Sequence, residues 1–399
     1  MKIVILANFP SLLNGKPNGR FTYLAKMLYE KGHEIEFIVS DFEHGPKKHR
    51  KITEGLYPYK VTYLHETGYP DNISLKRLWS HHVWGKNVGK HLKTIGKVDV
   101  VYAAVPSLTA AKAAADFCKK TGAKFIVDVQ DLWPEAFCMA IHNKVLQKGF
   151  LPMKWYVDKV YGAADVAVAV SDTYVNRIFS VNNHLNSGVS VFLGNDGDVF
   201  DKGRKEFKIQ RNDNELWLCY VGSLSYSYDI PCVIDALAMV NERGNVKQHI
   251  KFVVMGGGTL REKFEAHGKE KGVDCEFLGS KPYSEMVGIM CSCDMVINPI
   301  VKGSAASIIN KVGDYALSGL PVINTQESPE YRALVDEYQC GINCRCENAE
   351  DVADAIEKLA LNEELRKTMG TNSARLGRDK FDRRNTYQAI VDAVEDCVK

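Results

Sequence analysis

Apolar runs of strand length alternate with helical patterns along the first half of the chain. One helical pattern places Phe21, Leu24, Ala25 and Leu28 at the spacing of a buried helix face. Strands that are apolar throughout, and not only at every second residue, are typical of a parallel sheet covered by helices on both faces. The alternation therefore predicts an α/β fold with a doubly wound parallel sheet. The predicted strands of this half are Lys2–Ala7, Glu34–Val39, Val98–Ala103, Lys124–Val129, Val166–Val170 and Val189–Leu193.

A second series of the same kind follows a break in composition. Residues 194–215 are rich in charge, glycine and asparagine, which is typical of an interdomain linker. We therefore predict two Rossmann-like domains facing across a cleft, at residues 1–200 and 201–378. The helical segment 379–399 is predicted to pack back on the first domain. The predicted strands of the second series are Leu216–Val221, Ile250–Met255, Cys275–Leu278, Met295–Ile297 and Pro321–Asn324.

Composition restricts the class of protein. The chain is 45% hydrophobic and 25% charged, and no apolar run approaches the ~20 residues that a membrane-spanning helix needs. Met1 leads into a strand pattern and not into a secretory signal. The eleven cysteines have irregular spacing, so we interpret them as reduced thiols of a cytoplasmic protein. The group Cys340, Cys344 and Cys346 has no CxxC pair and no nearby histidine, which argues against zinc.

The stretch from Gly303 to Thr325 predicts an anion site. Small residues lead there into a helix that carries Asn310, Lys311 and Asp314. The first N–H groups of a helix have no intrahelical partner, so they favour a phosphate. Lys311 adds a full charge, and the Asp314 carboxylate suits a ribose diol. The alternative is an ordinary buried helix with both residues on its solvated rim.

Every earlier strand of the second series also ends in a small or polar loop. In doubly wound domains, ligands bind beyond the carboxyl ends of the strands. Several such loops at one edge of a sheet therefore predict a site of nucleotide size. The loop residues are Gly222, Ser223 and Tyr228 after the first strand, Gly256–Gly258 after the second, and Gly279, Ser280 and Lys281 after the third.

Two loops of the first half are also candidates. Gly19 and Arg20 lie where the chain enters a helix after the first strand, and glycine lets backbone amides approach a phosphate closely. Asp131 follows a predicted strand and lies next to Trp133 and Pro134. Its carboxylate could act as a base for an acceptor hydroxyl or bind a sugar. The alternative role for Asp131 is to cap the following helix.

Residues 47–97 carry an excess of positive charge. They contain 11 Lys and Arg against 3 Asp and Glu, whereas the whole chain has a net charge of only +2. Trp79 and Trp84 lie within this segment, which suits an anionic membrane surface. No nucleic-acid-binding motif accompanies the charge, so we expect no nucleic-acid partner. The alternative is a solvated helix with both tryptophans in the core.

Taken together, the motifs resemble those of the family 4 retaining glycosyltransferases, which have a GT-B fold. The resemblance runs nearly end to end, through FTYLAKMLYEKGHEIEFIV, AADVAVAVS, YVGSL, MGGGTLREKF and EFLGSKPYSEM. The segment QDLWPE, and the pattern N-K-x-x-D-Y-x-x-x-G-x-P-V from Asn310 to Val322, resemble a subgroup that builds bacterial cell-surface polysaccharides.

The resemblance implies transfer of a sugar from a UDP- or GDP-linked donor to an acceptor hydroxyl, with retention at the anomeric carbon. The resemblance implies no metal or other required cofactor, and no side-chain nucleophile, because the leaving phosphate helps to take the acceptor proton in place of one. The implied roles are ribose binding for Asp314, base contacts for Gly279 and Lys281, phosphate contacts for Gly19, Ser307 and Ile308, and a place beside the reacting sugar for Asp131.

The chain departs from the family pattern where the donor is held. The first signature glutamate falls at Ala306, and the phosphate-binding Arg and Lys fall at Ser223 and Tyr228. Loss of one contact to charge that develops in a transition state typically costs ~3 kcal/mol. We expect Lys311 and Arg20 to compensate, because they are the nearest cations in these loops.

The sequence therefore favours a hexosyltransferase-type enzyme of capsule or exopolysaccharide biosynthesis. Its acceptor would be a glycan or a polyprenyl-linked intermediate at the inner face of the plasma membrane. Two alternatives stay open. A GT-B sugar-nucleotide 2-epimerase would act without an acceptor, and a non-catalytic GT-B subunit would support a partner transferase.

Overall fold

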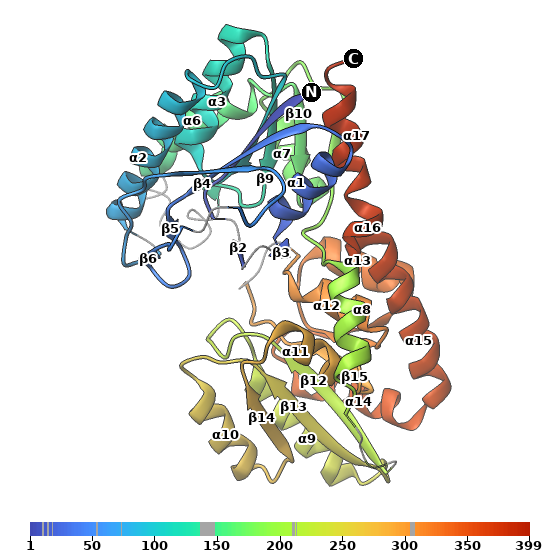
Figure 1. The fold of residues 1–399 in the computed structure, drawn as a ribbon. Coiled ribbons are helices and arrows are strands. Elements are labelled where there is room, and N and C mark those ends of the chain that lie inside the picture. The colour runs from blue at the N-terminus through green and yellow to red at the C-terminus, as the bar shows by residue number, and fades with distance from the viewer. Residues whose placement is uncertain are drawn as a thin grey trace. The chain divides into compact units, whose positions relative to one another are not determined.

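The protein forms two compact units (Figure 1). The computed structural model describes residues 1–9, 12–13, 16–17, 19–52, 55–72, 74–135, 148–209, 212, 214–303 and 308–399. Unit 1 comprises Met1–Phe192 together with Tyr387–Lys399, and unit 2 comprises Leu193–Thr386. Each unit is built on one parallel sheet.

Unit 1 has a seven-stranded sheet in the order β11-β10-β9-β8-β1-β4-β7. All of its pairings are parallel. Two short antiparallel hairpins, β2-β3 and β5-β6, lie outside it. In chain order the strands are β1 (Lys2–Ala7), β2 (Leu12–Leu13), β3 (Lys16–Pro17), β4 (Glu34–Ser40), β5 (Phe42–Glu43), β6 (Lys48–His49), β7 (Lys60–Leu64), β8 (Val100–Val105), β9 (Lys124–Val129), β10 (Val166–Ala169) and β11 (Gly188–Ser190).

Helices cover both faces of this sheet because its strands are apolar on both sides. Ile3 and Ile5 of β1 pack in one core cluster with residues of α1 and α17. Val4 and Leu6 point to the opposite face and pack with residues of α2, α3 and α6. The helices are α1 (Arg20–Glu30), α2 (Leu75–Leu92), α3 (Leu108–Thr121), α6 (Leu151–Tyr161), α7 (Asp172–Phe179) and α17 (Gln388–Asp396).

Unit 2 has a six-stranded parallel sheet in the order β14-β13-β12-β15-β16-β17. Helices α9 and α14 pack on it in one core cluster. The strands are β12 (Glu215–Val221), β13 (His249–Met255), β14 (Cys275–Gly279), β15 (Met295–Asn298), β16 (Val322–Asn324) and β17 (Gly341–Asn343). The helices are α8 (Gly197–Glu206), α9 (Ile230–Arg243), α10 (Arg261–Glu270), α11 (Tyr283–Met290), α12 (Lys311–Ser318), α13 (Pro329–Tyr338), α14 (Ala349–Leu361), α15 (Glu363–Leu376) and α16 (Arg383–Thr386).

The prediction of two doubly wound parallel-sheet domains is confirmed. The predicted strands did not include β7 and β17, which are edge strands without a fully buried residue. The interpretation of residues 194–215 as linker throughout was wrong. This segment contains α8, whose first turn is capped by the Asp196 carboxylate through the N–H groups of Asp198 and Val199.

Candidate functional site

The loops after β12 and β13 form a tight backbone layer at the carboxyl end of the unit 2 sheet. Gly222 N–H donates to the Met255 carbonyl at 2.9 Å, and Leu224 N–H donates to the Gly257 carbonyl at 2.9 Å. Gly256 has a φ of +144°, and a Cβ there would lie 1.7 Å from the Gly222 carbonyl oxygen. Only glycine fits at this position. The layer therefore presents main chain, and not side chains, to a ligand.

Helix α12 brings Lys311 over the end of β12. The hydroxyl of Tyr315 bonds the backbone of Val221, accepting from its N–H at 3.0 Å and donating to its carbonyl at 3.2 Å. Lys311 Nζ donates to the Tyr220 hydroxyl at 3.2 Å. The ammonium also lies 4.3 Å from the ring centroid of Tyr220 and 3.7 Å from that of Tyr228. These are cation–π distances.

Lys311 is half-buried, and its ammonium lies between two tyrosine rings. Among the described residues, no carboxylate forms an ion pair with it, although several other lysines have one. Burial holds the pKa of Lys311 well below its ordinary value. An anion brought beside the amine would reverse this effect, because an opposite charge favours the protonated form.

Asp314 lies one turn further along α12 and is buried. Its Oδ1 accepts hydrogen bonds from Asn195 Nδ2 at 2.7 Å and from the Tyr283 hydroxyl at 2.7 Å. Burial raises the pKa of Asp314 to about 6, while the Tyr283 hydrogen bond and Arg383 oppose the shift. Gly313 permits this contact, because a Cβ there would lie 2.4 Å from Asn195 Oδ1.

The other predicted donor residues of unit 2 lie in the loop after β12, at or just after the end of β14, and just before α12. Ser223 is exposed and its carbonyl accepts from the Tyr220 hydroxyl at 2.8 Å. Lys281 forms an ion pair with Glu285 at 2.8 Å, so its charge is already balanced. Gly279 ends β14 with a φ of +72°. Ile308 and Asn310 lead directly into α12, and Asn310 makes no side-chain cap.

The expected turn at Ser307 and the position of Ala306 lie outside the described residues. Tyr220 and Tyr283 contact side chains of α12 and were not predicted from the sequence. Tyr220 could have been suspected, because a tyrosine at the end of an apolar strand needs a partner for its hydroxyl.

Arg20 has a different place from the one we expected. It is 4% exposed, and its Nε donates to Asp128 Oδ2 at 2.7 Å. Its NH1 group donates to the carbonyl of Val191 at 2.9 Å. The expectation that Arg20 compensates for the missing phosphate contacts is therefore wrong, because this guanidinium is committed to a buried carboxylate. A lone aspartate within the apolar strand Lys124–Val129 was the signal that a buried cation was needed.

Gly19 lies at the N-terminus of α1, as the sequence predicts. Its N–H donates to Thr22 Oγ1 at 3.0 Å, and the Thr22 hydroxyl donates back to the Gly19 carbonyl at 3.0 Å. The Gly19 amide is therefore already occupied by a side chain of its own helix.

Asp131 is exposed and lies beyond the end of β9. The surrounding protein raises its pKa, and the positive charge of Arg77 opposes that shift. Trp133 is nearly buried, with the Arg77 guanidinium 4.8 Å from its ring centroid and the His81 ring stacked on it at 5.8 Å. The alternative capping role of Asp131 concerns residues 136–147, which lie outside the described residues.

Arg77 organises an aromatic cluster that the sequence analysis did not foresee. Its guanidinium also lies 5.6 Å from the Tyr69 ring centroid and 5.7 Å from that of Phe9. Burial and the charge of Arg77 lower the pKa of His81 to about 3, so this imidazole is neutral. Within the described part of the chain, Arg77 Nε and His81 Nε2 are buried without a hydrogen-bond partner. We call Phe9, Tyr69, Arg77, His81 and Trp133 the Arg77 cluster.

The two tryptophans of the basic segment differ. Trp84 is fully buried in the core, whereas Trp79 is 60% exposed on α2. A groove of about 530 Å³ runs between α2 and α3, which approach closely at Gly85. Five lysines line it, namely Lys86, Lys90, Lys93, Lys112 and Lys120. Of the described helices, none has the length and apolar character needed to cross a membrane.

Comparison with known structures identifies the fold. The crystal structure of Anabaena HepE in complex with UDP is similar over 99% of this chain and 100% of that chain, with a TM-score of 0.69 and 16% identity. HepE has also been solved with UDP-glucose, with a TM-score of 0.64 to this chain. The protein has the GT-B fold.

Sequence comparison relates unit 2 to glycosyltransferases. Residues 201–376 match the family described as "Glycosyl transferases group 1". Two uncharacterized glycosyltransferases of Methanocaldococcus jannaschii are 26% and 23% identical over 50% and 58% of this chain. The matched regions span 54% and 59% of those proteins, so the chain covers little more than half the length of these curated relatives.

Proposed function

We propose that this GT-B protein is a retaining glycosyltransferase that uses a nucleotide diphosphate sugar. The match of residues 201–376 to the group 1 glycosyl transferases supports the reaction class. The observation that carries the proposal is Lys311, a half-buried lysine whose ammonium lies between Tyr220 and Tyr228 at a strand end, without an ion-paired carboxylate among the described residues. A diphosphate would supply the missing negative charge.

In this proposal Lys311 stabilises the leaving diphosphate. Negative charge grows on the diphosphate as the bond to the sugar breaks, and a nearby ammonium in a water-poor site lowers the free energy of that state. Arrival of the phosphate raises the pKa of Lys311 and keeps it protonated during the reaction. The leaving phosphate then accepts the proton of the acceptor hydroxyl, so that no side-chain nucleophile or metal is needed.

The remaining contacts to the donor are proposed from position. The N-terminus of α12, at Ile308 and Asn310, directs backbone N–H groups toward the phosphates. Main-chain groups of Gly279 and Lys281 contact the base. Oδ1 of Asp314 is taken by Asn195 and Tyr283, so that a ribose contact would fall to Oδ2. HepE binds UDP and UDP-glucose, which makes UDP the first nucleotide to test and GDP the second.

We place the acceptor at the Arg77 cluster and Asp131. Among the described residues, Arg77 Nε and His81 Nε2 have no hydrogen-bond partner and suit the hydroxyl groups of an acceptor. Asp131 lies beside them with a raised pKa, which favours a hydrogen bond to the acceptor or help in removing its proton. The acceptor class that we propose is a glycan or polyprenyl-linked intermediate of surface polysaccharide synthesis.

The lysine-lined groove of α2 and α3 supports a further part of the proposal, which is association with an anionic membrane surface. Trp79 and Leu75 are 60% and 84% exposed on the same helix. Sedimentation with vesicles that contain anionic lipid tests this point. We expect Trp79→Ala with Lys86→Gln to reduce the bound fraction, and binding to neutral vesicles to stay low.

Calorimetry with UDP and GDP, followed by hydrolysis of a panel of nucleotide sugars, tests the proposed function. We expect one nucleotide to bind and its sugar conjugate to be hydrolysed slowly without acceptor. Lys311→Met should abolish most of this binding, whereas Lys247→Met, at an exposed loop lysine, should not. Failure of every nucleotide to bind would contradict the proposal and favour a non-catalytic subunit. Conversion of a nucleotide sugar to its 2-epimer would identify an epimerase.

A further inference from the structure

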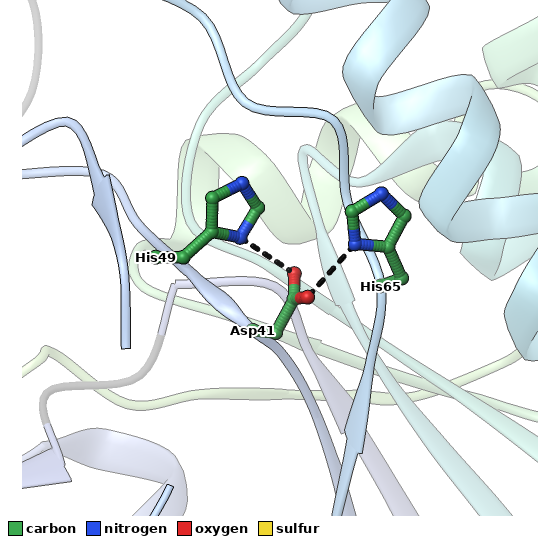
Figure 2. A group of neighbouring side chains, drawn as sticks. All are labelled: Asp41, His49 and His65. Carbon is green, nitrogen blue, oxygen red and sulfur yellow. Dashed lines mark hydrogen bonds and ion pairs between the residues drawn. The ribbon is translucent and has the colours of Figure 1, made fainter. Parts of the chain in front are cut away.

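Three potential metal ligands meet at one end of the unit 1 sheet, on residues that the proposed transfer reaction does not use (Figure 2). Asp41 directly follows β4 and His65 directly follows β7. These parallel strands pair Ser40 with Leu64, so the two residues that follow lie side by side. His49 comes from the β5–β6 hairpin, where it pairs with Phe42, the neighbour of Asp41. Backbone pairing therefore brings all three together.

The distances between the three side chains suit a small cation. His65 Nδ1 lies 2.9 Å from Asp41 Oδ2, and His49 Nδ1 lies 3.4 Å from Asp41 Oδ1. One ligand atom from each residue lies within 4.8 Å of the other two. The imidazole rings are stacked, with centroids 5.6 Å apart and planes at 12°. Zinc binds nitrogen and oxygen at roughly 2.0–2.2 Å, so ligands around it lie ~3–3.6 Å apart. The two Asp41–histidine distances are already close to this range, so the main contraction would be between the two imidazole nitrogens.

The carboxylate is held in place by the backbone. Asp41 Oδ1 accepts from the N–H of Glu66 at 2.8 Å. The Asp41 N–H donates to the Leu64 carbonyl at 3.0 Å, and its own carbonyl accepts from the Arg50 N–H at 2.7 Å. Such surrounding hydrogen bonds orient a metal ligand before the ion arrives. The imidazoles stay accessible, since the side chains of His49 and His65 are 48% and 59% exposed.

We propose that Asp41, His49 and His65 form a binding site for a divalent transition metal, with Zn²⁺ the first candidate. Two imidazoles and one carboxylate match the ligand preference of zinc, and three protein ligands leave one position for water. Each imidazole would bind through Nδ1 as the neutral ring with its proton on Nε2, so a proton that Nδ1 shares with the carboxylate moves through solvent to Nε2 when the ion binds. This site is independent of the proposed glycosyl transfer.

The metal would tie the β5–β6 hairpin to the sheet. The turn of that hairpin carries His44 and Lys47, which reach Tyr69 of the Arg77 cluster. His44 Nδ1 lies 2.6 Å from the Tyr69 hydroxyl, and Lys47 Nζ lies 4.8 Å from the Tyr69 ring centroid. A bound ion would thus order the hairpin that borders the Arg77 cluster.

The test is titration of the metal-stripped, full-length chain with Zn²⁺ alone, followed by metal analysis after gel filtration. We expect one zinc ion per chain. When Co²⁺ replaces zinc, we expect the visible absorption bands of cobalt in a coordination site of low symmetry. His49→Ala and His65→Ala should each lower the affinity for zinc by more than the roughly 10- to 100-fold that loss of an outer-shell partner causes. Asp41→Asn should also weaken zinc binding, although the asparagine side chain has nearly the same shape as aspartate.

His249→Ala is the matched control. His249 is an exposed histidine of unit 2 whose Nε2 lies 2.8 Å from Asp274 Oδ2. Its loss should leave zinc affinity unchanged. Hydrogen exchange supplies a second readout, since zinc should slow exchange at the Arg50 amide in the unmodified chain and not in His65→Ala. Absence of zinc from the unmodified chain, or zinc binding that survives His49→Ala/His65→Ala, would overturn the proposal.

Discussion

Arg20 and Lys311 are both cations at the N-terminus of a helix, α1 and α12 respectively, but Arg20 is buried whereas Lys311 is half-buried with its ammonium between two aromatic rings. Arg20 forms an ion pair with Asp128 and bonds to backbone carbonyls. Lys311 is surrounded by the rings of Tyr220 and Tyr228, without a carboxylate in the described residues. A buried cation with its own counter-ion belongs to the fold. A cation without a counter-ion is available to a ligand.

The largest expected effect tests the paired cation. Arg20→Met should lower the free energy of unfolding by about 3–5 kcal/mol, because it leaves the Asp128 carboxylate buried and uncompensated. Urea unfolding followed by circular dichroism measures this loss. The double variant Arg20→Met/Asp128→Leu should recover much of the stability. Equal stability of Arg20→Met and the unmodified chain would contradict the claim that Arg20, unlike Lys311, stabilises the fold.

The next effect tests the cation without a counter-ion. Lys311→Met should lower kcat about 10²- to 10³-fold, as expected when a contact to transition-state charge is removed. Stability of the ligand-free chain should stay the same or rise, because a desolvated amine is replaced by an apolar side chain of similar length. Single-turnover rates and urea unfolding on the same sample separate the two effects. A stability loss as large as that of Arg20→Met would show that Lys311 belongs to the fold.

The third effect concerns the neighbouring Asp314. Its pKa of about 6 in the folded protein lies above the ordinary value of 3.8. Between these two values the folded chain holds a proton that the unfolded chain releases, so unfolding free energy falls as pH rises through this window. Asp314→Asn removes this pH-dependent contribution. The unfolding free energy of the variant, relative to that of the unmodified chain, should therefore rise by up to about 3 kcal/mol between pH 4 and 6. Parallel pH profiles of the two proteins would contradict the assignment.

The smallest effect concerns the rings around Lys311. Tyr228→Leu should weaken nucleotide binding about threefold to tenfold, because a cation–π contact of ~1 kcal/mol is lost and the ammonium is less well positioned. Tyr226 provides the control, since it lies two residues away and is 80% exposed. Calorimetry should therefore give unchanged affinity for Tyr226→Leu. If both variants lose affinity equally, nucleotide binding depends on the conformation of the loop and not on the Tyr228 ring.

Much of this arrangement could be predicted from local patterns. The strands, the α12 segment and the position of Lys311 follow from apolar periodicity and from small residues before a helix. The partner of Arg20 could not be predicted in this way, since Asp128 lies 108 positions along the chain and meets it only in the folded unit. The Arg77 cluster could not be predicted from local patterns either, because Phe9, Tyr69 and Trp133 come from three separate loops.

The place of Lys311 has a consequence for turnover. A contact that favours the negative charge of the departing diphosphate also holds the spent nucleotide, so it cannot by itself help the product to leave. We therefore expect the free nucleoside diphosphate to compete with the donor, and the rate at which it departs to limit how fast successive sugars are added.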